Sequence, residues 1–152
     1  MVYGMITRQC VGPLVFIDGS MDARLYKEVL RLSVYPTLIR QLSEFGEQHS
    51  YVDDGASYHD AEATIEFCAQ KGIDRPYWPA RNPDMSPIEW VWGWIKQKLN
   101  NLETRPSTMQ ELKDKVSEIW YAITPEQILK LYRTMPERVK ELEKVRGWHT
   151  KY

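Results

Sequence analysis

Two acidic residues, Asp54 and Glu89, stand where a compact domain could bring their carboxylates together. Asp54 closes the segment SYVDD, which is short, aromatic and β-branched, and Glu89 follows the proline-rich loop WPARNPDMSPI. Because like charges repel within a few ångströms, such a pair either shares a proton or holds a cation. With no cluster of Cys or His nearby, these hard oxygen ligands suit Mg²⁺ or Mn²⁺. The pattern predicts a metal site for phosphoryl transfer.

Each acid also has an ordinary structural interpretation. Asp54 precedes Gly55, and its side chain could cap a turn there. Glu89 follows Pro87 at the start of a predicted helix, where the helix dipole favours an acidic side chain. From these residues alone, both interpretations stay open.

The elements around the acids alternate between strands and helices. The pattern predicts a hairpin of Val2–Ile6 with Pro13–Ile17, followed by a third strand at Ser50–Asp54. Helical spacing of apolar residues predicts helices over residues 22–34, 36–45, 61–71, 87–99, 107–122, 124–132 and 136–145. A break or kink is expected at Pro36, and the last helix is expected to start at Pro136. This order favours an α/β domain with a mixed sheet.

The composition describes one globular domain of 152 residues with 43% hydrophobic residues. A formal charge of −1 gives no whole-molecule field that would attract nucleic acid. Two distant cysteines, Cys10 and Cys68, favour a reduced intracellular protein, nuclear or cytoplasmic, over a disulfide scaffold. No secretion signal and no membrane span is expected, because no long uninterrupted apolar run occurs.

Longer motifs surround both acids. Residues 78–99, WPARNPDMSPIEWVWGWIKQKL, place a Trp-Pro, a Pro-Asp, an Ile-Glu and a Trp-Gly in order, and DGASYH puts Asp54 five residues before His59. These segments resemble the catalytic domain of mariner-superfamily cut-and-paste DNA transposases. VYGMI and GPLVFIDGSMDARLYKEVL upstream, and TMPERVKELEKVRGWHTKY downstream, are similar to the same family, so the resemblance covers nearly the whole chain.

The resemblance implies a ribonuclease-H-like mixed sheet flanked by helices, with residues 1–100 as a truncated catalytic core and residues 101–152 as a helical C-terminal tail. It implies that Asp54 and Glu89 are catalytic acids and metal ligands that use Mg²⁺ or Mn²⁺ to cut and join DNA. In that family the first catalytic aspartate lies on a strand upstream of the one matched at Val2. Asp18 and Asp22 fall at turn and capping positions instead. We therefore expect an incomplete triad, weak metal binding and no cleavage by this chain alone.

Other side chains have a functional and an ordinary interpretation. His59 could position a phosphate, or serve as a cap or a packed side chain. Arg81 and Lys96 could meet DNA phosphates or simply be solvated, and Trp90 could stack on a base or pack on a partner. Asp53 stands where the family usually has Gln, and strand alternation would turn it away from Asp54.

A non-catalytic alternative also stays open. The chain could be a domesticated remnant that acts as a protein-interaction or dimerisation module. A sheet without its first strand would have an unpaired edge, so a homo-oligomer or strand pairing with another chain is expected.

Overall fold

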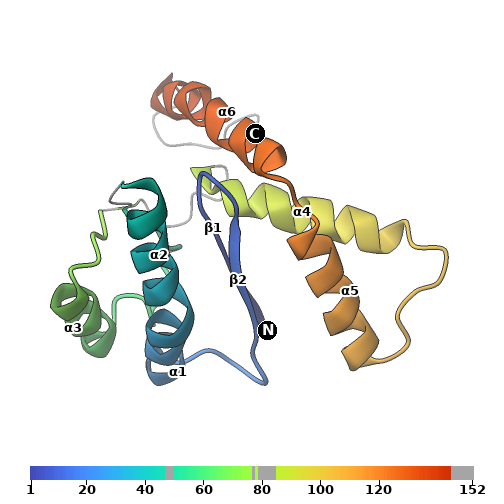
Figure 1. The fold of residues 1–152 in the computed structure, drawn as a ribbon, viewed down its shortest axis with the longest axis horizontal. Coiled ribbons are helices and arrows are strands. Elements are labelled where there is room, and N and C mark those ends of the chain that lie inside the picture. The colour runs from blue at the N-terminus through green and yellow to red at the C-terminus, as the bar shows by residue number, and fades with distance from the viewer. Residues whose placement is uncertain (47–49, 77, 79–84, 145–152) are drawn as a thin grey trace. The chain divides into compact units, whose positions relative to one another are not determined.

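The computed structural model describes residues 1–46, 50–76, 78 and 85–144, and Figure 1 shows a β-hairpin with a series of helices. The elements are β1 (Val2–Ile6), β2 (Val11–Phe16), α1 (Ala23–Val29), the π-helical turn η1 (Leu30–Val34), α2 (Tyr35–Phe45), α3 (Glu62–Lys71), α4 (Pro87–Asn100), α5 (Met109–Tyr121) and α6 (Pro125–Lys144). The α/β class is confirmed, and among the described residues the sheet is the two-stranded antiparallel pair β1–β2 rather than a mixed sheet. Within the described ranges, no helix has the length and apolar content needed to cross a bilayer.

The hairpin of β1 and β2 agrees with the sequence prediction. Met1 and Ile17 exchange backbone hydrogen bonds of 2.8 and 2.9 Å, which makes the pair antiparallel. At the turn, the Thr7 N–H donates to the Cys10 carbonyl at 2.9 Å. Strand β2 begins at Val11, two residues before the predicted start, because the turn is closed by Thr7 and Cys10 rather than by a later glycine.

The predicted third strand at Ser50–Asp54 is wrong, since residues 50–56 have no regular secondary structure. Within the described chain, its backbone makes one hydrogen bond to another backbone, from the Tyr51 N–H to the Asp74 carbonyl at 2.7 Å. The Ser50 hydroxyl adds a side-chain bond to the Asp74 carboxylate. An extended segment becomes a strand only when a neighbour supplies a ladder of such bonds, and no described segment does so here.

The chain divides into two compact units, which are described separately. The first unit is Met1–Tyr3 with Val15–Asn82, and the second is Gly4–Leu14 with Pro83–Tyr152. The division at residue 100 that the sequence suggested stays a prediction.

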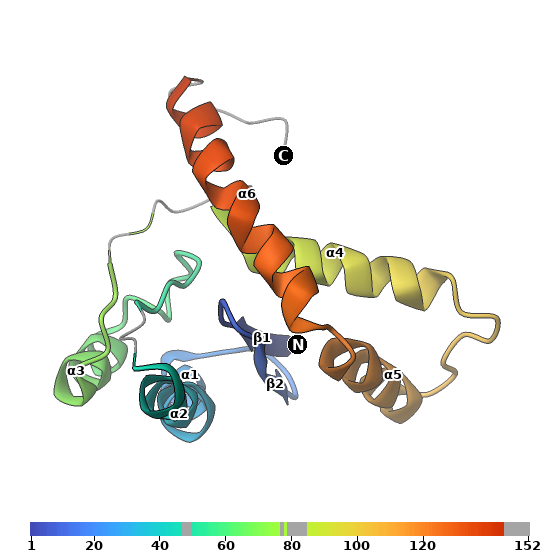
Figure 2. The same cartoon turned by 45° about the horizontal axis from the view of Figure 1, so that its top comes forward.

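In the first unit, α1, η1 and α2 form one helical run, and α3 packs beside α1 (Figure 2). The run begins at Asp22, whose carboxylate accepts the Leu25 N–H at 2.7 Å, as its capping role predicts. Of the break or kink expected at Pro36, the break does not occur; a π-helical turn precedes the proline instead. In η1 the Tyr35 N–H donates to the Leu30 carbonyl five residues back, and Pro36 therefore starts α2 at a position where its missing N–H is tolerated.

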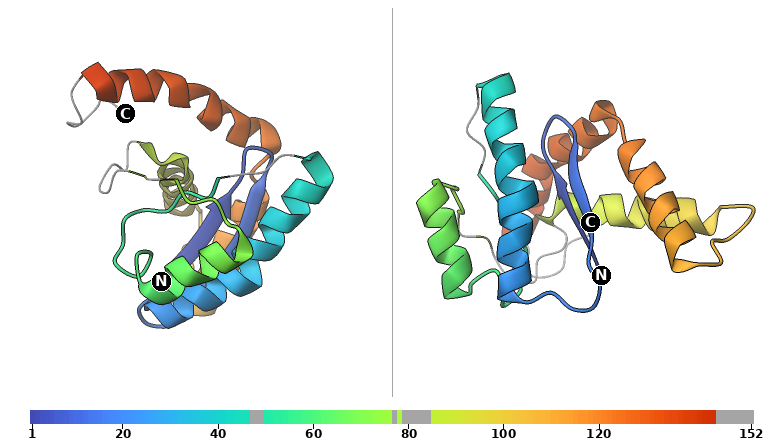
Figure 3. Two further views of the ribbon diagram at one scale, coloured as in Figure 1. Left: turned by 90° about the vertical axis from the view of Figure 1, so that its left-hand side faces the viewer. Right: turned by 60° about the horizontal axis from the view of Figure 1, so that its bottom comes forward.

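The second unit packs α4 against α5 and α6 (Figure 3). At its centre, Trp120 is fully buried and stacks on Trp92 with ring centroids 5.2 Å apart. The Trp120 indole N–H donates to the Gly12 carbonyl of β2 at 3.0 Å. Trp92 is thus a packing residue of this unit.

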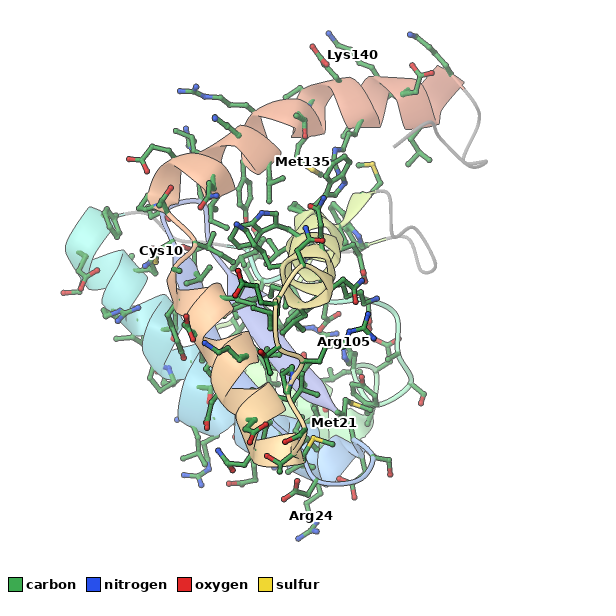
Figure 4. All side chains as sticks on the ribbon, turned by 90° about the vertical axis from the view of Figure 1, so that its right-hand side faces the viewer. Cys10, Met21, Arg24, Arg105, Met135 and Lys140 are labelled. Carbon is green, nitrogen blue, oxygen red and sulfur yellow. The ribbon has the colours of Figure 1, made fainter. Side chains whose placement is uncertain are left out.

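Helix α6 is continuous, so the prediction of two helices separated at Pro136 is wrong. An interior proline usually costs about 3 kcal/mol because it removes a helical hydrogen bond. Ile128 and Arg138, which lie on either side of Pro136, are both buried. Their packing offsets this cost and keeps the helix continuous. Figure 4 shows Met135 on the side of α6 that faces α4 and Lys140 on the opposite side.

The indole rings require a glycine at position 4. A Cβ at Gly4 would lie 2.7 Å from Cη2 of Trp120 and 2.8 Å from Cη2 of Trp92. We expect Gly4→Ala to lower the free energy of unfolding by about 1–3 kcal/mol, because two stacked rings must move. Urea unfolding of the purified chain measures the change.

Gly93→Ala is the matched control. A Cβ at Gly93 would meet no atom of the described residues within 4 Å, and Gly93 lies inside α4. This substitution should raise the free energy of unfolding by up to about 1 kcal/mol through helix propensity. Equal effects of the two substitutions would contradict the packing described for the rings.

Candidate functional site

Adjacent carboxylates in the SYVDD segment have opposite environments. The Asp53 side chain is 13% exposed, whereas the Asp54 side chain is 79% exposed. This difference in exposure is what alternation in an extended segment predicts. The Asp54 carboxylate accepts the Ala56 N–H at 3.3 Å, so Asp54 caps the turn. The same carboxylate is still accessible to solvent.

The Asp53 carboxylate contacts three side chains, Arg75, Tyr26 and His59. Arg75 Nη2 lies 2.8 Å from Oδ2 and 3.0 Å from Oδ1 of Asp53, and the Tyr26 hydroxyl donates to Oδ2 at 3.3 Å. His59 Nδ1 lies 3.3 Å from Oδ1. Burial raises the pKa of Asp53, but the contacts with His59 and Arg75 outweigh it and leave the pKa below its ordinary value. Arg75 is therefore committed to Asp53 in this structure.

A chain of tyrosine hydroxyls leads to Asp53. The hydroxyl of Tyr51 lies 2.8 Å from that of Tyr3 on β1 and 2.8 Å from that of Tyr26 on α1. Burial is the main cause that raises the pKa of all three tyrosines, so they stay neutral. These side chains fix the extended segment in place of a strand ladder. Sequence reasoning missed them, because no local pattern links residues 25 and 48 positions apart.

His59 lies between the two carboxylates. Its Nδ1 faces Asp53, and its Nε2 lies 3.7 Å from Oδ1 of Asp54. The ring is stacked on Tyr26, with centroids 4.4 Å apart and planes inclined by 6°. His59 is buried and does not cap α3, whose N-cap position is Ala61. Of the two ordinary roles considered for it, packing is the one observed.

Glu89 belongs to the second unit, in the first turn of α4. Its N–H donates to the carbonyl of Ser86 at 3.1 Å, while the Ser86 side chain makes no capping bond. Glu89 and Lys96 are exposed and lie two turns apart, so they share one face of the helix. The predicted approach of the Asp54 and Glu89 carboxylates to within about 8 Å, a span that metal ligation could bridge, stays a prediction. Arg81 lies outside the described residues.

Trp90 contacts the C-terminal helix. The guanidinium carbon of Arg138 lies 4.8 Å from the centre of the Trp90 ring, and Arg138 Nε donates to the Thr134 hydroxyl at 3.0 Å. Arg138 is 2% exposed, whereas Trp90 is 48% exposed. Stacking of a guanidinium on an indole is favourable. Trp90 therefore joins α4 to α6, and a role in DNA binding stays a prediction.

Asp54 fits the chemistry of a divalent-cation ligand. Its carboxylate is accessible, and among the described residues no Lys or Arg nitrogen lies within 4.0 Å of it. Glu89 offers a second exposed carboxylate. No group of three or more His, Cys, Asp or Glu side chains is gathered for metal binding in the part of the chain that the structure describes. Either acid could therefore ligate Mg²⁺ or Mn²⁺, and neither forms a complete site alone.

The sequence matches a model of the DDE superfamily endonuclease domain over residues 1–113, which include Asp54 and Glu89. The chain belongs to the DDE superfamily. The Tcb2 transposase of Caenorhabditis briggsae is 26% identical over 100% of this chain and 54% of its own length. The chain spans about half the length of the curated relatives it matches.

Solved structures confirm the fold of this DDE superfamily chain. The Mos1 transposase catalytic domain with raltegravir and Mg superposes with a TM-score of 0.87 at 17% identity, covering 99% of this chain and 76% of that one. The Mos1 mariner paired-end complex with Mn gives a TM-score of 0.81 at 19% identity, covering 95% and 43%. The ribonuclease-H-like class and the resemblance to mariner-superfamily transposases are thus both confirmed.

The charge of Asp53 should stabilise the first unit in a pH-dependent way. Its pKa is lower in the folded chain than the ordinary 3.8, so its contribution is present above about pH 4 and is lost as the pH falls through the lowered value. Asp53→Asn should lower the free energy of unfolding by about 1–3 kcal/mol at pH 6. The difference from the parent should shrink at pH 3, as measured by urea unfolding.

Asp60→Asn is the control for this effect. Asp60 also lies near Arg75, at 3.7 Å, but its side chain is 75% exposed. It should change stability little at either pH, because exposed ion pairs contribute little. A pH-independent difference between Asp53→Asn and the parent would contradict the role given to the charge.

Proposed function

We propose that this chain is part of the catalytic domain of a Tc1/mariner-type transposase that cleaves and joins DNA strands by metal-dependent phosphoryl transfer. The observation that carries the proposal is the family match over residues 1–113, which contains both Asp54 and Glu89 in their motifs. The exposed carboxylate of Asp54 supports it, because a ligand must be accessible to an ion. The activity belongs to a longer protein in the relatives, so here it is inferred.

Asp54 and Glu89 are assigned as ligands of Mg²⁺ or Mn²⁺. In this chemistry a bound divalent cation activates the attacking oxygen or stabilises the leaving oxygen of a phosphodiester. The rest of the site orients the ligands. Asp53, His59 and Arg75 hold the segment that ends in Asp54, and the first turn of α4 presents Glu89.

DNA is the inferred substrate, and an intracellular site of action follows from it. Lys96 lies on the same face of α4 as Glu89, where a cation can meet a phosphate close to a cleavage site. Arg81 in the proline-rich loop and Trp90 at the start of α4 are further candidates for DNA contact. The similarity to a Mos1 paired-end complex supports both DNA binding and pairing with a second chain.

A protein-interaction role is a second candidate, and one observation favours it. Ile39, Leu42 and Phe45 on α2 are each about half exposed. On the same helix, the polar Thr37 and Gln41 are buried. An apolar face that is turned to solvent is typical of a surface that another chain covers.

We expect the 152-residue chain alone to leave supercoiled plasmid uncut in Mn²⁺. Two cations about 4 Å apart need several shared anionic ligands, and the family motifs place only two of three catalytic acids within these residues. Calorimetry should detect at most one weakly bound Mn²⁺, which Asp54→Asn and Glu89→Gln each weaken at least tenfold. Nicking by the parent that both variants lose would show that another residue replaces the third acid.

The same variants test the activity in a chimaera. The portion of the Tcb2 transposase that precedes its matched region is joined ahead of Met1 to supply the remaining acid. We expect Mn²⁺-dependent nicking by the chimaera and a loss of at least a hundredfold in rate with Asp54→Asn or Glu89→Gln. A chimaera that nicks equally well with both substitutions would overturn the assignment of these acids.

Self-association is expected through the exposed apolar face of α2, the edge of the hairpin, or both. Sedimentation velocity at high concentration should show a species larger than the monomer, and Leu42→Lys should weaken it if α2 takes part. Arg40→Ala, on the opposite side of α2, is the matched control and should leave association unchanged. A strictly monomeric parent at every concentration would contradict this expectation.

A further inference from the structure

The placement of His59 between Asp53 and Asp54 is not explained by packing alone. A histidine that only fills space needs no carboxylate at either nitrogen. Here Nδ1 lies 3.3 Å from Oδ1 of Asp53, and Nε2 lies 3.7 Å from Oδ1 of Asp54. The two acids differ sharply, since Asp53 is largely shielded and already paired with Arg75, whereas Asp54 is exposed.

The ring of His59 is held in one orientation. It is stacked on Tyr26 at 4.4 Å, and a tilted contact with Tyr58 at 4.5 Å supports another side. Tyr26 is itself fixed by its hydroxyl bonds to Tyr51 and Asp53. These contacts hold the ring with Nε2 on the side of Asp54.

The two candidate ligand atoms lie at a distance that one ion can span. Nε2 of His59 is 3.7 Å from Oδ1 of Asp54, longer than a direct hydrogen bond. Oδ1 of Asp53 lies 3.3 Å from Nδ1, which makes no hydrogen bond among the described residues, so Asp53 acts on the ring through its negative charge. A divalent cation between Nε2 and the Asp54 oxygen would bind both.

We propose that His59 is a metal ligand, with Nε2 and the Asp54 carboxylate binding one divalent cation and Asp53 orienting the ring through Nδ1. The bonds from nitrogen or oxygen to such a cation are each about 2.1 Å long, so two ligands of one ion lie at most about 4.2 Å apart. The 3.7 Å separation satisfies this limit. A carboxylate behind a ligating histidine is a recurrent arrangement in metal sites.

The ligand set decides which cation is preferred. Mg²⁺ takes oxygen ligands, whereas an imidazole nitrogen favours transition-metal ions. A site made from Asp54 and His59 should therefore bind Mn²⁺ more tightly than Mg²⁺. The inference rests on the proposed function, because it concerns the ion held by Asp54 in that proposal.

Pulsed electron paramagnetic resonance of Mn²⁺ bound to the full chain tests the nitrogen directly. The chain has three histidines, and the double variant H49Q/H149Q keeps His59 as the only one. With ¹⁵N-histidine labelling, we expect this variant to show ¹⁵N coupling to the bound Mn²⁺ without any change at the site. Absence of this coupling would overturn the proposal.

Substitutions at the site add two readouts. His59→Gln should remove the nitrogen coupling, lower Mn²⁺ affinity at least tenfold and leave Mg²⁺ affinity nearly unchanged. Asp53→Asn should keep the coupling but weaken Mn²⁺ binding about tenfold, as expected for a residue that orients a ligand. Coupling that persists in His59→Gln would overturn the proposal. Thermal unfolding confirms that each variant is folded.

Asp54→Asn separates this inference from the proposed function. If Asp54→Asn abolishes Mn²⁺ binding while His59→Gln changes neither affinity nor spectrum, His59 is not a ligand and the proposed function stands. If Asp54→Asn leaves Mn²⁺ binding unchanged, the metal site of the proposed function is wrong, and the inference falls with it.

Discussion

The ion pair between Asp53 and Arg75 is the interaction on which the rest of the candidate site depends. Asp54 ends a segment with a single backbone hydrogen bond to another backbone in the described chain, so side chains must position it. Arg75, Tyr26 and His59 all meet at the Asp53 carboxylate. A charge that is largely shielded from water is tolerated when it is paired and hydrogen-bonded, and here Arg75 and Tyr26 donate to the carboxylate while His59 lies beside it. Asp54, the candidate metal ligand, is therefore positioned through its neighbour Asp53 rather than through a sheet.

Much of the fold follows from local sequence patterns. The hairpin, the helix that starts at Pro87 and the capping of α1 by Asp22 each depend on residues within a few positions of one another. The predictions that failed needed information from further away. Ser50–Asp54 is β-like in composition but lacks a ladder partner, and Pro136 stays inside a helix because buried residues on both sides hold it there.

The acids of the candidate site could be proposed from the sequence, but the side chains that hold Asp54 in place could not. The motifs around Asp54 and Glu89 are contiguous in sequence, so a resemblance can identify them. Arg75 and Tyr26 lie 22 and 27 residues from Asp53, and nothing in their own neighbourhoods marks them as its partners. A single sequence does not show which of several distant basic or aromatic side chains pairs with a given carboxylate. That choice is made by tertiary packing.

The hydroxyl chain has a direction. Tyr26 has one hydroxyl proton and gives it to Asp53, so in the next bond Tyr51 must be the donor, and Tyr3 must then donate to Tyr51. All three O–H dipoles therefore point toward the same carboxylate, and each polarises the next. A chain of aligned hydroxyl dipoles thus links Tyr3, at the start of β1, to the carboxylate of Asp53, about fifty residues later in the sequence. Loss of the Tyr3 hydroxyl would therefore weaken the positive potential at Asp53, although the two residues do not touch.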